Sequence, residues 1–547
     1  MPIEFASVAI GQIPRKLADH DAAVHEEEPP SSEHPSSEPP AQKATATVRS
    51  SVFNLANTIL GAGMLGIPNA FSRCGMVAGL ALILVFAGLS SLGLYMLSAA
   101  CDIIGRPASF RTVAEKAMPG SGMLLSAAIA IKCFGVGTSY LIVVGDAMPQ
   151  ALLAFGIQAE SGWLDRRLWS FLAALVVSPL CFLRSVHSLR HFSLVALVCI
   201  LFVVVLIVTF AVNPPLAPVL DPCPRTGAPS AHAAHEDDEA SYHATNTSLV
   251  DAASASLLDD ASACRGPVVS FGGGVSTLTA LPTFIFAYTC HQVGDLPRSH
   301  ALACLGMPSL VPSLTLIFAC TSWHQNIVGI TNELRGASPS GRRTSGNEVR
   351  VIGYAMAIAM SIYTAVAVGG YATFGAYVHS DVLTSYPTSP LLAVARVAVA
   401  IVVTLSYPLQ SHPSRACVLA IAEALDARRA RTAAAATAGG SAVAPLPTSA
   451  RRDRRLFLLV TTAFLVLSTV IALLVSDLSL ILSIVGATGS TTVSYLLPGL
   501  CYWRLCADPR ARLRRAALGL LVFGVAVMIL SLSLIVIRHL PHSAGSE

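Results

Sequence analysis

The sequence predicts an all-α polytopic membrane protein that crosses the bilayer about eleven times. Of its 547 residues, 54% are hydrophobic and 12% are charged, whereas soluble proteins average roughly 25% charged residues. From residue 50 onward, long apolar blocks recur, and a crossing helix needs about 20 apolar residues. The blocks are uniformly apolar and do not alternate with period two, which excludes a closed barrel. This composition also argues against a soluble multidomain enzyme, a disordered chain and a disulfide scaffold.

The expected spans follow the apolar blocks in chain order, and the fourth is short. They cover residues 50–72, 76–101, 123–148, 168–183, 191–212, 270–291 (continuing near 326–333), 350–375, 390–411, 456–475, 477–501 and 516–537.

A polar tail precedes the first span. Residues 1–48 are acidic and rich in Pro and Ser, and such a segment buries too little apolar surface to fold. We expect a disordered cytosolic tail there and a membrane domain over residues 50–537. Lys and Arg concentrate in alternate loops, above all in the basic loop 424–455. Because basic residues favour the cytosolic side, the N-terminus is predicted to be cytosolic.

The loop 213–268 is the longest one on the opposite side. It is acidic and contains one glycosylation sequon, at Asn246, which a lumenal or extracellular position would expose to modification. Cys223 and Cys264 bracket this loop and would close it as a disulfide in an oxidising compartment. The alternative is a pair of free thiols. No Cys-x-x-Cys pair and no cluster with zinc spacing occurs, so no metal site is expected.

Two spans carry signs of interruption. Gly61, Ala62 and Gly63 lie near the middle of the first span, and the sixth span ends in the polar run Tyr288 to Gln292. Interrupted helices at corresponding positions of two repeats hold substrate and coupling ion in many secondary transporters, because freed backbone groups face the ligand. The alternative for the glycines is close helix packing. Gly61 to Gly66 also spells a dinucleotide fingerprint, which we reject because no strand precedes it.

Lys132, His291 and Arg396 are three of the ionisable side chains that lie within the spans. Lys132 is well inside the third span, where a charge is costly and usually faces a cavity or a partner. It would bind a carboxylate, replace a cation or take part in proton coupling, unless it snorkels or is paired structurally. His291 lies at the second interruption and titrates near neutral pH, so it is a candidate proton relay. Arg396 is closer to a membrane face and is expected to snorkel.

Four stretches resemble the amino acid/auxin permease family, and in particular its fungal vacuolar amino-acid transporters. They are residues 53–68, 132–149, 284–292 joined to 326–334, and 406–415. The resemblance implies the LeuT-like fold of the amino acid–polyamine–organocation superfamily, a 5+5 inverted repeat plus one helix. Sodium-coupled neutral amino acid transporters are relatives, and they imply an ion site at Asn57 and Thr404. Ser406 supplies a further neutral oxygen nearby in the sequence.

The sequence departs from the family at residues 293–325. The family runs its Cys-His-Gln motif directly into the motif found here at 326–334, whereas this chain has 33 intervening residues. We hypothesise a retained intron, because the segment begins with Val, whose codons start GT, and ends with Gln, which CAG encodes. The alternative is a true re-entrant insertion. A twelfth span there would move the later basic loops to the outside, against the distribution of positive charge.

These observations predict a secondary active transporter of amino acids, neutral ones by resemblance, coupled to H+ or Na+. The substrate carboxylate would bind backbone N–H groups at Gly61–Gly63, and its side chain would face Tyr288, Thr289 and Cys290, with Lys132 beside them. The expected membrane is vacuolar, lysosomal or plasma membrane, and the partners are the substrate and lipid, without nucleic acid or cofactor. The alternative is a membrane amino-acid sensor that binds without transporting. An enzyme is not expected, since the spans hold no nucleophile–base pair or metal motif.

Overall fold

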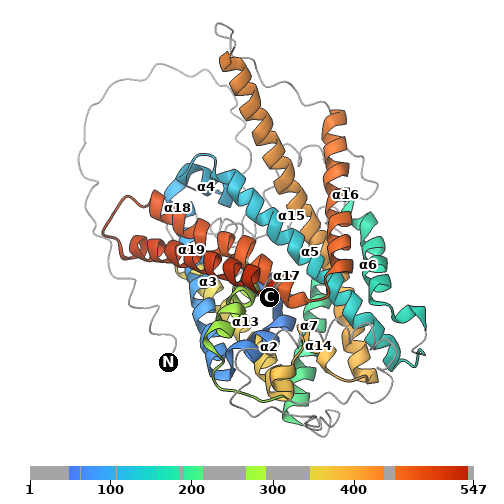
Figure 1. Ribbon diagram of the computed structural model, residues 1–547. Helices are drawn as coiled ribbons and strands as arrows, with labels where there is room; N and C mark the ends of the chain where they lie inside the picture. The colour runs from blue at the N-terminus through green and yellow to red at the C-terminus, as the bar shows by residue number, and fades with distance from the viewer. Residues whose placement is uncertain are drawn as a thin grey trace, which may run out of the picture. The chain divides into compact units, whose positions relative to one another are not determined.

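The computed structural model describes residues 48–61, 63–105, 108–158, 161–183, 190–213, 266–290, 345–436 and 450–539. All regular elements within these ranges are helices, which confirms the all-α fold class (Figure 1). The chain divides into two units, Met1–Lys43 and Ala44–Glu547, and the first unit lies wholly outside the described ranges. The predicted tail, the loop 214–265 and the insert 293–325 also fall outside them.

The helices occupy the predicted blocks in order. They are α1 (Val48–Ile59), α2 (Gly63–Cys74), α3 (Met76–Ile104), α4 (Phe110–Ala117), α5 (Ser121–Ala154), η2 (Gly162–Leu164), α6 (Arg166–Cys181), α7 (Arg190–Val212), α9 (Gly274–Ala287), α13 (Ser345–Phe374), η5 (Gly375–Tyr377), α14 (Val382–Ser385), α15 (Pro390–Ala436), α16 (Ala450–Leu474), α17 (Leu478–Val485), η6 (Gly486–Ser490), η7 (Thr492–Leu496), α18 (Leu497–Leu505) and α19 (Arg512–His539).

Seven of the described helices are long and apolar enough to cross a bilayer, and α7 and α9 add two shorter apolar segments. The number of crossings therefore remains a prediction. Helix α4 is an addition to the predicted spans. Ser109 and Thr112 form a capping box that fixes its start, a local signal that hydropathy does not register.

Helix α5 is the centre of the bundle. In an apolar stretch of 18 residues of α5, 78% of the residues are buried, against 22% in the corresponding stretch of α19. Small residues explain this position, because a Cβ on Gly135 would lie 2.0 Å from Val485 of α17 and one on Gly145 would lie 2.3 Å from Ser170 of α6. Glycines thus let two neighbouring helices approach the α5 backbone, as in other membrane bundles.

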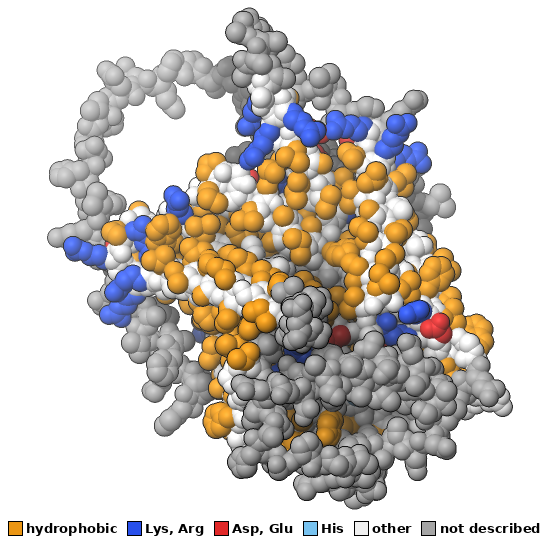
Figure 2. Space-filling model, in the orientation of Figure 1, with side chains coloured by type: hydrophobic (Ala, Val, Ile, Leu, Met, Phe, Trp, Pro, Cys, Tyr) orange, Lys and Arg blue, Asp and Glu red, His pale blue; other side chains and the backbone are white. Residues whose placement is uncertain are grey.

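The outward faces of the peripheral helices are apolar. Leu459 and Leu474 of α16 are 65% and 78% exposed, and Val522 of α19 is 59% exposed. Figure 2 shows hydrophobic side chains over these helices, and Lys and Arg gathered at the ends of α15 and α16 and at the junction of α18 with α19. Such a surface suits lipid around its middle and water at its basic ends.

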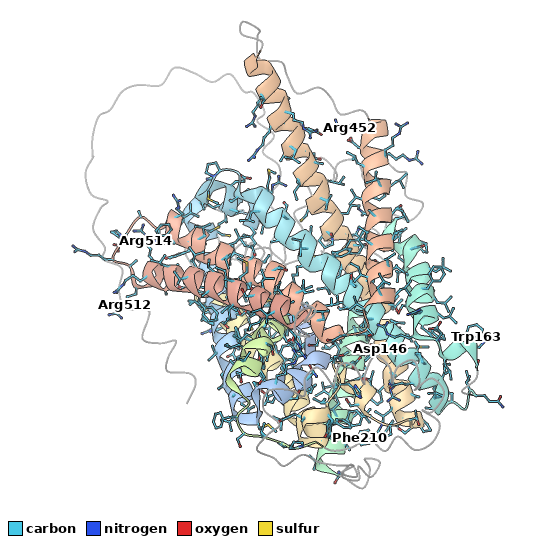
Figure 3. All side chains as sticks on the ribbon, viewed as in Figure 1. Asp146, Trp163, Phe210, Arg452, Arg512 and Arg514 are labelled. Carbon is cyan, nitrogen blue, oxygen red and sulfur yellow. The ribbon has the colours of Figure 1, made fainter. Side chains whose placement is uncertain are left out.

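Arg452 and Asp146 lie beside opposite ends of α16 (Figure 3). Arg452, near the start of α16, forms an ion pair with Asp426 of α15. Asp426 lies in the part of α15 that is predicted to extend into the cytosol. Asp146 lies beside the other end of α16. We call the end that carries Asp146, α14 and the start of α17 the outer end, because the positive charge predicts that it faces away from the cytosol.

The tenth predicted span is irregular in its middle. Two π-helical segments, η6 and η7, separate α17 from α18, and π-helical turns are frequent at functional sites. The glycines of η6 allow close contacts, since a Cβ on Gly486 would lie 2.0 Å from the Pro282 carbonyl oxygen of α9. A Cβ on Gly489 would lie 2.9 Å from Lys132 Cβ of α5.

Candidate functional site

The first span is broken where its glycines predict. Helix α1 ends at Ile59 and α2 begins at Gly63, and the Met64 N–H donates to the Gly61 carbonyl oxygen at 3.1 Å across the turn. The first turn of a helix carries N–H groups without an intrahelical acceptor. The break therefore presents backbone donors and the positive end of the α2 dipole inside the bundle. Ala62 itself lies outside the described residues.

The sixth span also ends inside the bundle, directly beside this break. Helix α9 stops at Ala287 and Tyr288 forms its C-cap. A Cβ on Gly63 would lie 3.1 Å from the Ala287 Cα and 3.3 Å from the Phe286 ring. Gly63 serves close packing, while a Cβ on Gly61 meets no atom of the described residues within 4 Å, and binding of a ligand at these glycines remains a prediction. The two interruptions lie together, as the inverted-repeat arrangement predicts.

Side chains from three helices bind the carbonyl groups that the end of α9 leaves free. Ser90 of α3 donates to the Tyr288 carbonyl oxygen at 2.7 Å, and Lys132 of α5 donates to that of Thr289 at 3.1 Å. The Tyr363 hydroxyl of α13 lies 2.9 Å from the Ala287 oxygen and 2.7 Å from the Ile59 oxygen of α1. Tyr363 therefore joins the two broken segments, and sequence reasoning missed it because nothing in the motif distinguishes it.

Lys132 is buried, with 3% of its surface exposed. Its Nζ binds a carbonyl oxygen, and among the described residues it forms no ion pair with a carboxylate. An ammonium group without a counter-ion is costly in a low-dielectric interior. The structure thus places Lys132 inside the bundle, bound to a backbone carbonyl oxygen at the end of α9, which fits the alternative of a structural pairing, and its role in substrate or proton binding remains a prediction.

Buried hydroxyls without partners surround the end of α9. Tyr288 and Tyr495 keep their hydroxyl oxygens, and Ser490 its Oγ, without a hydrogen bond to the described residues. Ser494 Oγ of η7 donates to Thr289 Oγ1 at 3.3 Å. Because unsatisfied buried polar groups are rare in folded proteins, these oxygens are candidates to bind a ligand, a water molecule or a residue outside the described ranges. In the sequence, the run of small and polar residues at 486–494 is the feature that could have predicted hydroxyl groups at this position.

The remaining predicted site residues are less closely joined. Thr404 and Ser406 are half-buried in the middle of α15, and among the described residues no hydrogen bond links them to α1, α2 or α9. Asn57 lies two residues before the end of α1, and Cys290 is a buried free thiol at the end of the described segment. The side chain of Asn57, and His291, Asn246, Cys223 and Cys264, lie outside the described residues.

The prediction for Arg396 is wrong. Its side chain is 0% exposed and its guanidinium donates to the carbonyl oxygens of Leu383 at 3.0 Å and of Tyr386. These acceptors belong to α14 and the segment after it, which folds over the start of α15. A buried loop of carbonyl groups explains why the arginine turns inward, since charge-assisted hydrogen bonds satisfy them.

A family model described as "Transmembrane amino acid transporter protein" matches residues 44–216 and 310–537. Vacuolar amino acid transporter 5 of Schizosaccharomyces pombe is 30% identical over 499 residues, covering 89% of this chain and 93% of the relative. The Saccharomyces cerevisiae protein of the same name is 29% identical and covers 90% and 98%. Human sodium-coupled neutral amino acid transporter 7 is 24% identical and covers 92% and 88%. The chain belongs to the transmembrane amino acid transporter family, the amino acid/auxin permease family that its motifs indicate.

Proposed function

We propose that this protein is a secondary active transporter that moves an amino acid across its membrane by alternating access, driven by a proton or sodium gradient. The observation that carries the proposal is the break between α1 and α2, packed against the end of α9. The relatives named as vacuolar transporters and those named as sodium-coupled neutral transporters both support amino acids as the substrate class. The name of the human relative supports a neutral substrate, and the names of the yeast relatives support a vacuolar membrane.

A zwitterionic substrate fits the charges of the two helix ends. Its carboxylate would accept hydrogen bonds from the first turn of α2, which is the positive end of a helix dipole. Its ammonium would bind carbonyl oxygens near the ends of α1 and α9, in competition with Tyr363 and Lys132, which hold them here. The substrate side chain would face Tyr288, Thr289 and Cys290. The open space beside Gly61 is where the backbone of the substrate would lie.

Two ion sites remain candidates. Asn57, Thr404 and Ser406 offer the neutral oxygens that sodium prefers, while Lys132 and His291 offer groups that exchange a proton. The site would face the two sides of the membrane in turn when the broken segments rock against the rest of the bundle. Rocking in this way is typical of transporters built from repeats.

The test is flux of labelled neutral amino acids into sealed vesicles, with an imposed pH gradient compared with an imposed sodium gradient. The full chain and the chain lacking residues 293–325 are both measured. Gly61→Ala tests the site, because a methyl group there costs no packing yet occupies the space for the substrate. Gly88→Ala is the matched control, since its Cβ also meets nothing within 4 Å but lies on α3.

We expect flux to follow one of the two gradients, to fall at least tenfold in Gly61→Ala and to persist in Gly88→Ala. Equal flux in both variants would move the site away from the break. Binding of the amino acid without flux under either gradient would contradict transport and favour the sensor hypothesis. Neither the structure nor the relatives favour a sensor.

A further inference from the structure

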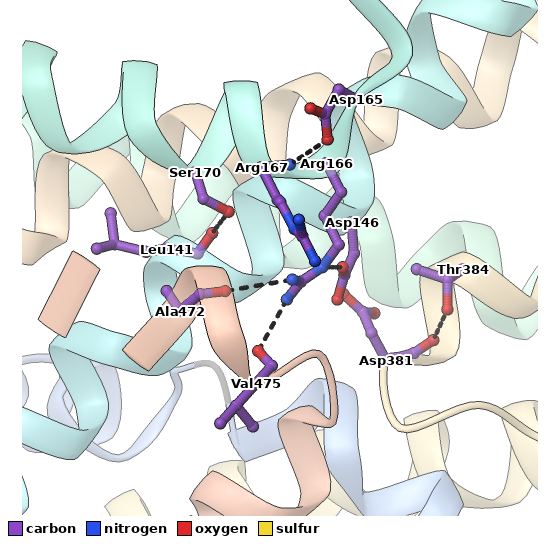
Figure 4. A network of polar contacts seen from close by, with 10 residues as sticks. All are labelled: Leu141, Asp146, Asp165, Arg166, Arg167, Ser170, Asp381, Thr384, Ala472 and Val475. Atoms are coloured by element: carbon purple, nitrogen blue, oxygen red, sulfur yellow. Dashed lines mark hydrogen bonds and ion pairs between the residues drawn. The ribbon is translucent and has the colours of Figure 1, made fainter. Parts of the chain in front are cut away.

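Two acidic side chains from different elements lie side by side at the outer end. Asp146 belongs to the last third of α5, and Asp381 is the N-cap of α14. Figure 4 shows their carboxyl groups directed toward each other. Two ionised carboxylates at close range repel, so such a pair favours one bound proton. Neither residue belongs to the helix break described above.

Asp381 is buried and incompletely hydrogen-bonded. Its side chain is 1% exposed, and Oδ1 accepts the Leu383 N–H at 2.9 Å, which starts α14. Its Oδ2 is buried and has no hydrogen-bond partner in the described part of the chain. A proton on Oδ2 would turn this unsatisfied acceptor into a donor to the Asp146 carboxylate, which removes the cost of leaving it unpaired.

Charged groups from every neighbouring element surround the pair. The positive charge of Arg396 of α15 acts on Asp381, but its Nη2 is bound to carbonyl groups and its Nη1 has no partner among the described residues. Arg166 of α6 binds Asp146. Asp477 at the start of α17 adds a further negative charge near Asp146. Further charged or titratable groups at this end among the described residues are His379, on the Asp381 segment, Arg73 of α2, which donates to Ser479, Arg538 of α19, which lines a pocket with Arg73 and Asp477, and the exposed Asp165 and Arg167 at the start of α6.

These surroundings favour the protonated form of Asp381. Burial is the main cause that raises the pKa of this carboxyl, to about 7, and the Asp146 charge adds to it. The Leu383 N–H and the Arg396 charge act in the opposite direction. The group therefore exchanges its proton near neutral pH.

The pair is linked to the packing of four elements. Arg166 binds Asp146 and also donates to the carbonyl oxygens of Ala472 at 3.2 Å and Val475 at 3.1 Å, at the end of α16 (Figure 4). Asp381 lies on the segment that covers the start of α15. Separation of the two carboxyl groups would thus loosen α14 from α5, α6 and α16. Asp146 is 18% exposed, which gives the pair contact with water.

We propose that one proton shared by Asp381 and Asp146 holds the outer end closed and is released when this end opens. Asp381 Oδ2 donates this proton to Asp146 in the closed arrangement. Loss of the proton leaves two carboxylates facing each other, and α14 separates from α5. Acid on the outer side therefore favours closure. The inference rests on the proposed alternating access, because it assigns a proton-sensitive step to that cycle.

Exchange of labelled amino acid across liposomes that contain the full chain tests the inference, with equal pH on both sides so that no gradient drives flux. Asp381→Asn keeps the size of the side chain but cannot ionise. Asp165→Asn is the matched control, because Asp165 is an exposed N-cap on the same end and Asn caps a helix equally well. Infrared difference spectra of the purified wild-type chain give a direct reading of carboxyl protonation.

We expect wild-type exchange to fall about tenfold between about pH 6 and pH 8, because the proton is lost and the outer end stays open. Exchange by Asp165→Asn should fall to the same extent. In Asp381→Asn the fall should be less than about twofold. The wild-type spectra should show a carboxyl band that disappears across this range and is missing from Asp381→Asn. An unchanged pH dependence in Asp381→Asn would overturn the inference while leaving transport intact.

Complete absence of exchange in the wild type and in both variants would count against the proposed function. The spectra would then decide separately whether Asp381 carries the proton. If Asp381→Asn does not fold, the wild-type spectra still decide it. A wild-type chain without any carboxyl that titrates between about pH 6 and pH 8 overturns the inference.

Discussion

Tyr363 is a single side chain that joins both interrupted helices. Its hydroxyl lies within hydrogen-bond distance of the Ile59 and Ala287 carbonyl oxygens, and one O–H cannot fully satisfy both at once. One of the two oxygens is therefore left with capacity to accept a hydrogen bond from a substrate ammonium.

We expect Tyr363→Phe to lower flux about tenfold, because two buried carbonyl oxygens lose their donor at about 1–3 kcal/mol. Tyr407→Phe is the control, since the Tyr407 hydroxyl is also buried but pairs with Ser468 on α16, away from the break. Flux and thermal unfolding in detergent are measured for both. Equal loss of flux in the two variants would show that Tyr363 has no special place in the cycle.

Lys132 and Ser90 make comparable hydrogen bonds to neighbouring carbonyl groups, at Thr289 and Tyr288. Lys132→Met and Ser90→Ala should each lower stability by about 1–3 kcal/mol. If Lys132 also provides its charge to substrate or ion, Lys132→Met should reduce flux at least tenfold more than Ser90→Ala, and we expect this result. The comparison uses initial rates at saturating substrate, and similar rates would assign Lys132 a structural role only.

Asp381 makes stability depend on pH in a defined direction. Its pKa rises from an ordinary 3.8 to about 7, so the folded chain binds more protons than the unfolded chain between these values. Stability then falls as pH rises through this window, by at most about 1.4 kcal/mol per unit. Burial lowers the pKa of His379. The contribution of His379 to stability therefore decreases as the pH is lowered, whereas that of Asp381 increases.

Comparison of wild type with Asp381→Asn cancels the histidine contribution. We expect the wild-type unfolding temperature to decrease between about pH 5 and pH 7, and this decrease to be smaller in Asp381→Asn. Parallel curves for the two proteins would show that Asp381 does not titrate in this range.

Among the elements, the π-helical pair η6 and η7 is the one that the sequence predicts least well. Hydropathy identifies the block 477–501 as one span, whereas α17, two π segments and α18 share it. Ser494 and Tyr495 of η7 lie beside the end of α9, where Ser494 donates to Thr289 and Tyr495 lies near Cys290 and Tyr288. Backbone hydrogen-bond register depends on packing against α5 and α9, which a single sequence does not encode locally.

Gly486→Ala tests the fit between η6 and α9. The new methyl group would lie 2.0 Å from a backbone oxygen at Pro282, so the two segments must separate at a cost of about 1–3 kcal/mol. Gly519→Ala on α19 meets nothing within 4 Å and should stabilise its helix by about 0.5–1 kcal/mol. Thermal unfolding should therefore shift in opposite directions, and a shift in the same direction would contradict the tight contact.

On the scale of the whole molecule, hydropathy predicted the membrane class and the order of the spans, while glycines and a polar run predicted the two interruptions. These features depend on what faces lipid and on helix-breaking residues, both of which are written in local sequence. The burial of Arg396, the Tyr363 bridge and the pair Asp146–Asp381 could not be predicted, because residues far apart in the chain create them. Lys132 was identified as a candidate because a charge inside a membrane is costly. Its carbonyl partner could be identified only from the structure.

The insert hypothesis makes a prediction for the whole chain. Residues 293–325 separate Cys290 from the motif at 326–334, and the family match resumes at 310, inside the segment, so it does not mark the boundaries. We expect transcripts without this segment, and at least tenfold higher flux from the shorter chain, because the second half of the broken span then follows its first half directly. Transcripts containing only the full sequence, together with equal flux from both chains, would sink the hypothesis.

The three donors at the end of α9 have a consequence for genetics. Ser90, Lys132 and Tyr363 come from three helices spread over much of the chain, yet all bind one short stretch of backbone. Loss-of-function alleles at these scattered positions should behave as one class, and intragenic suppressors of any one should map to Tyr288 and Thr289 or to the facing Ser494. A random mutagenesis screen scored by growth would then identify the residues that interact at the end of α9.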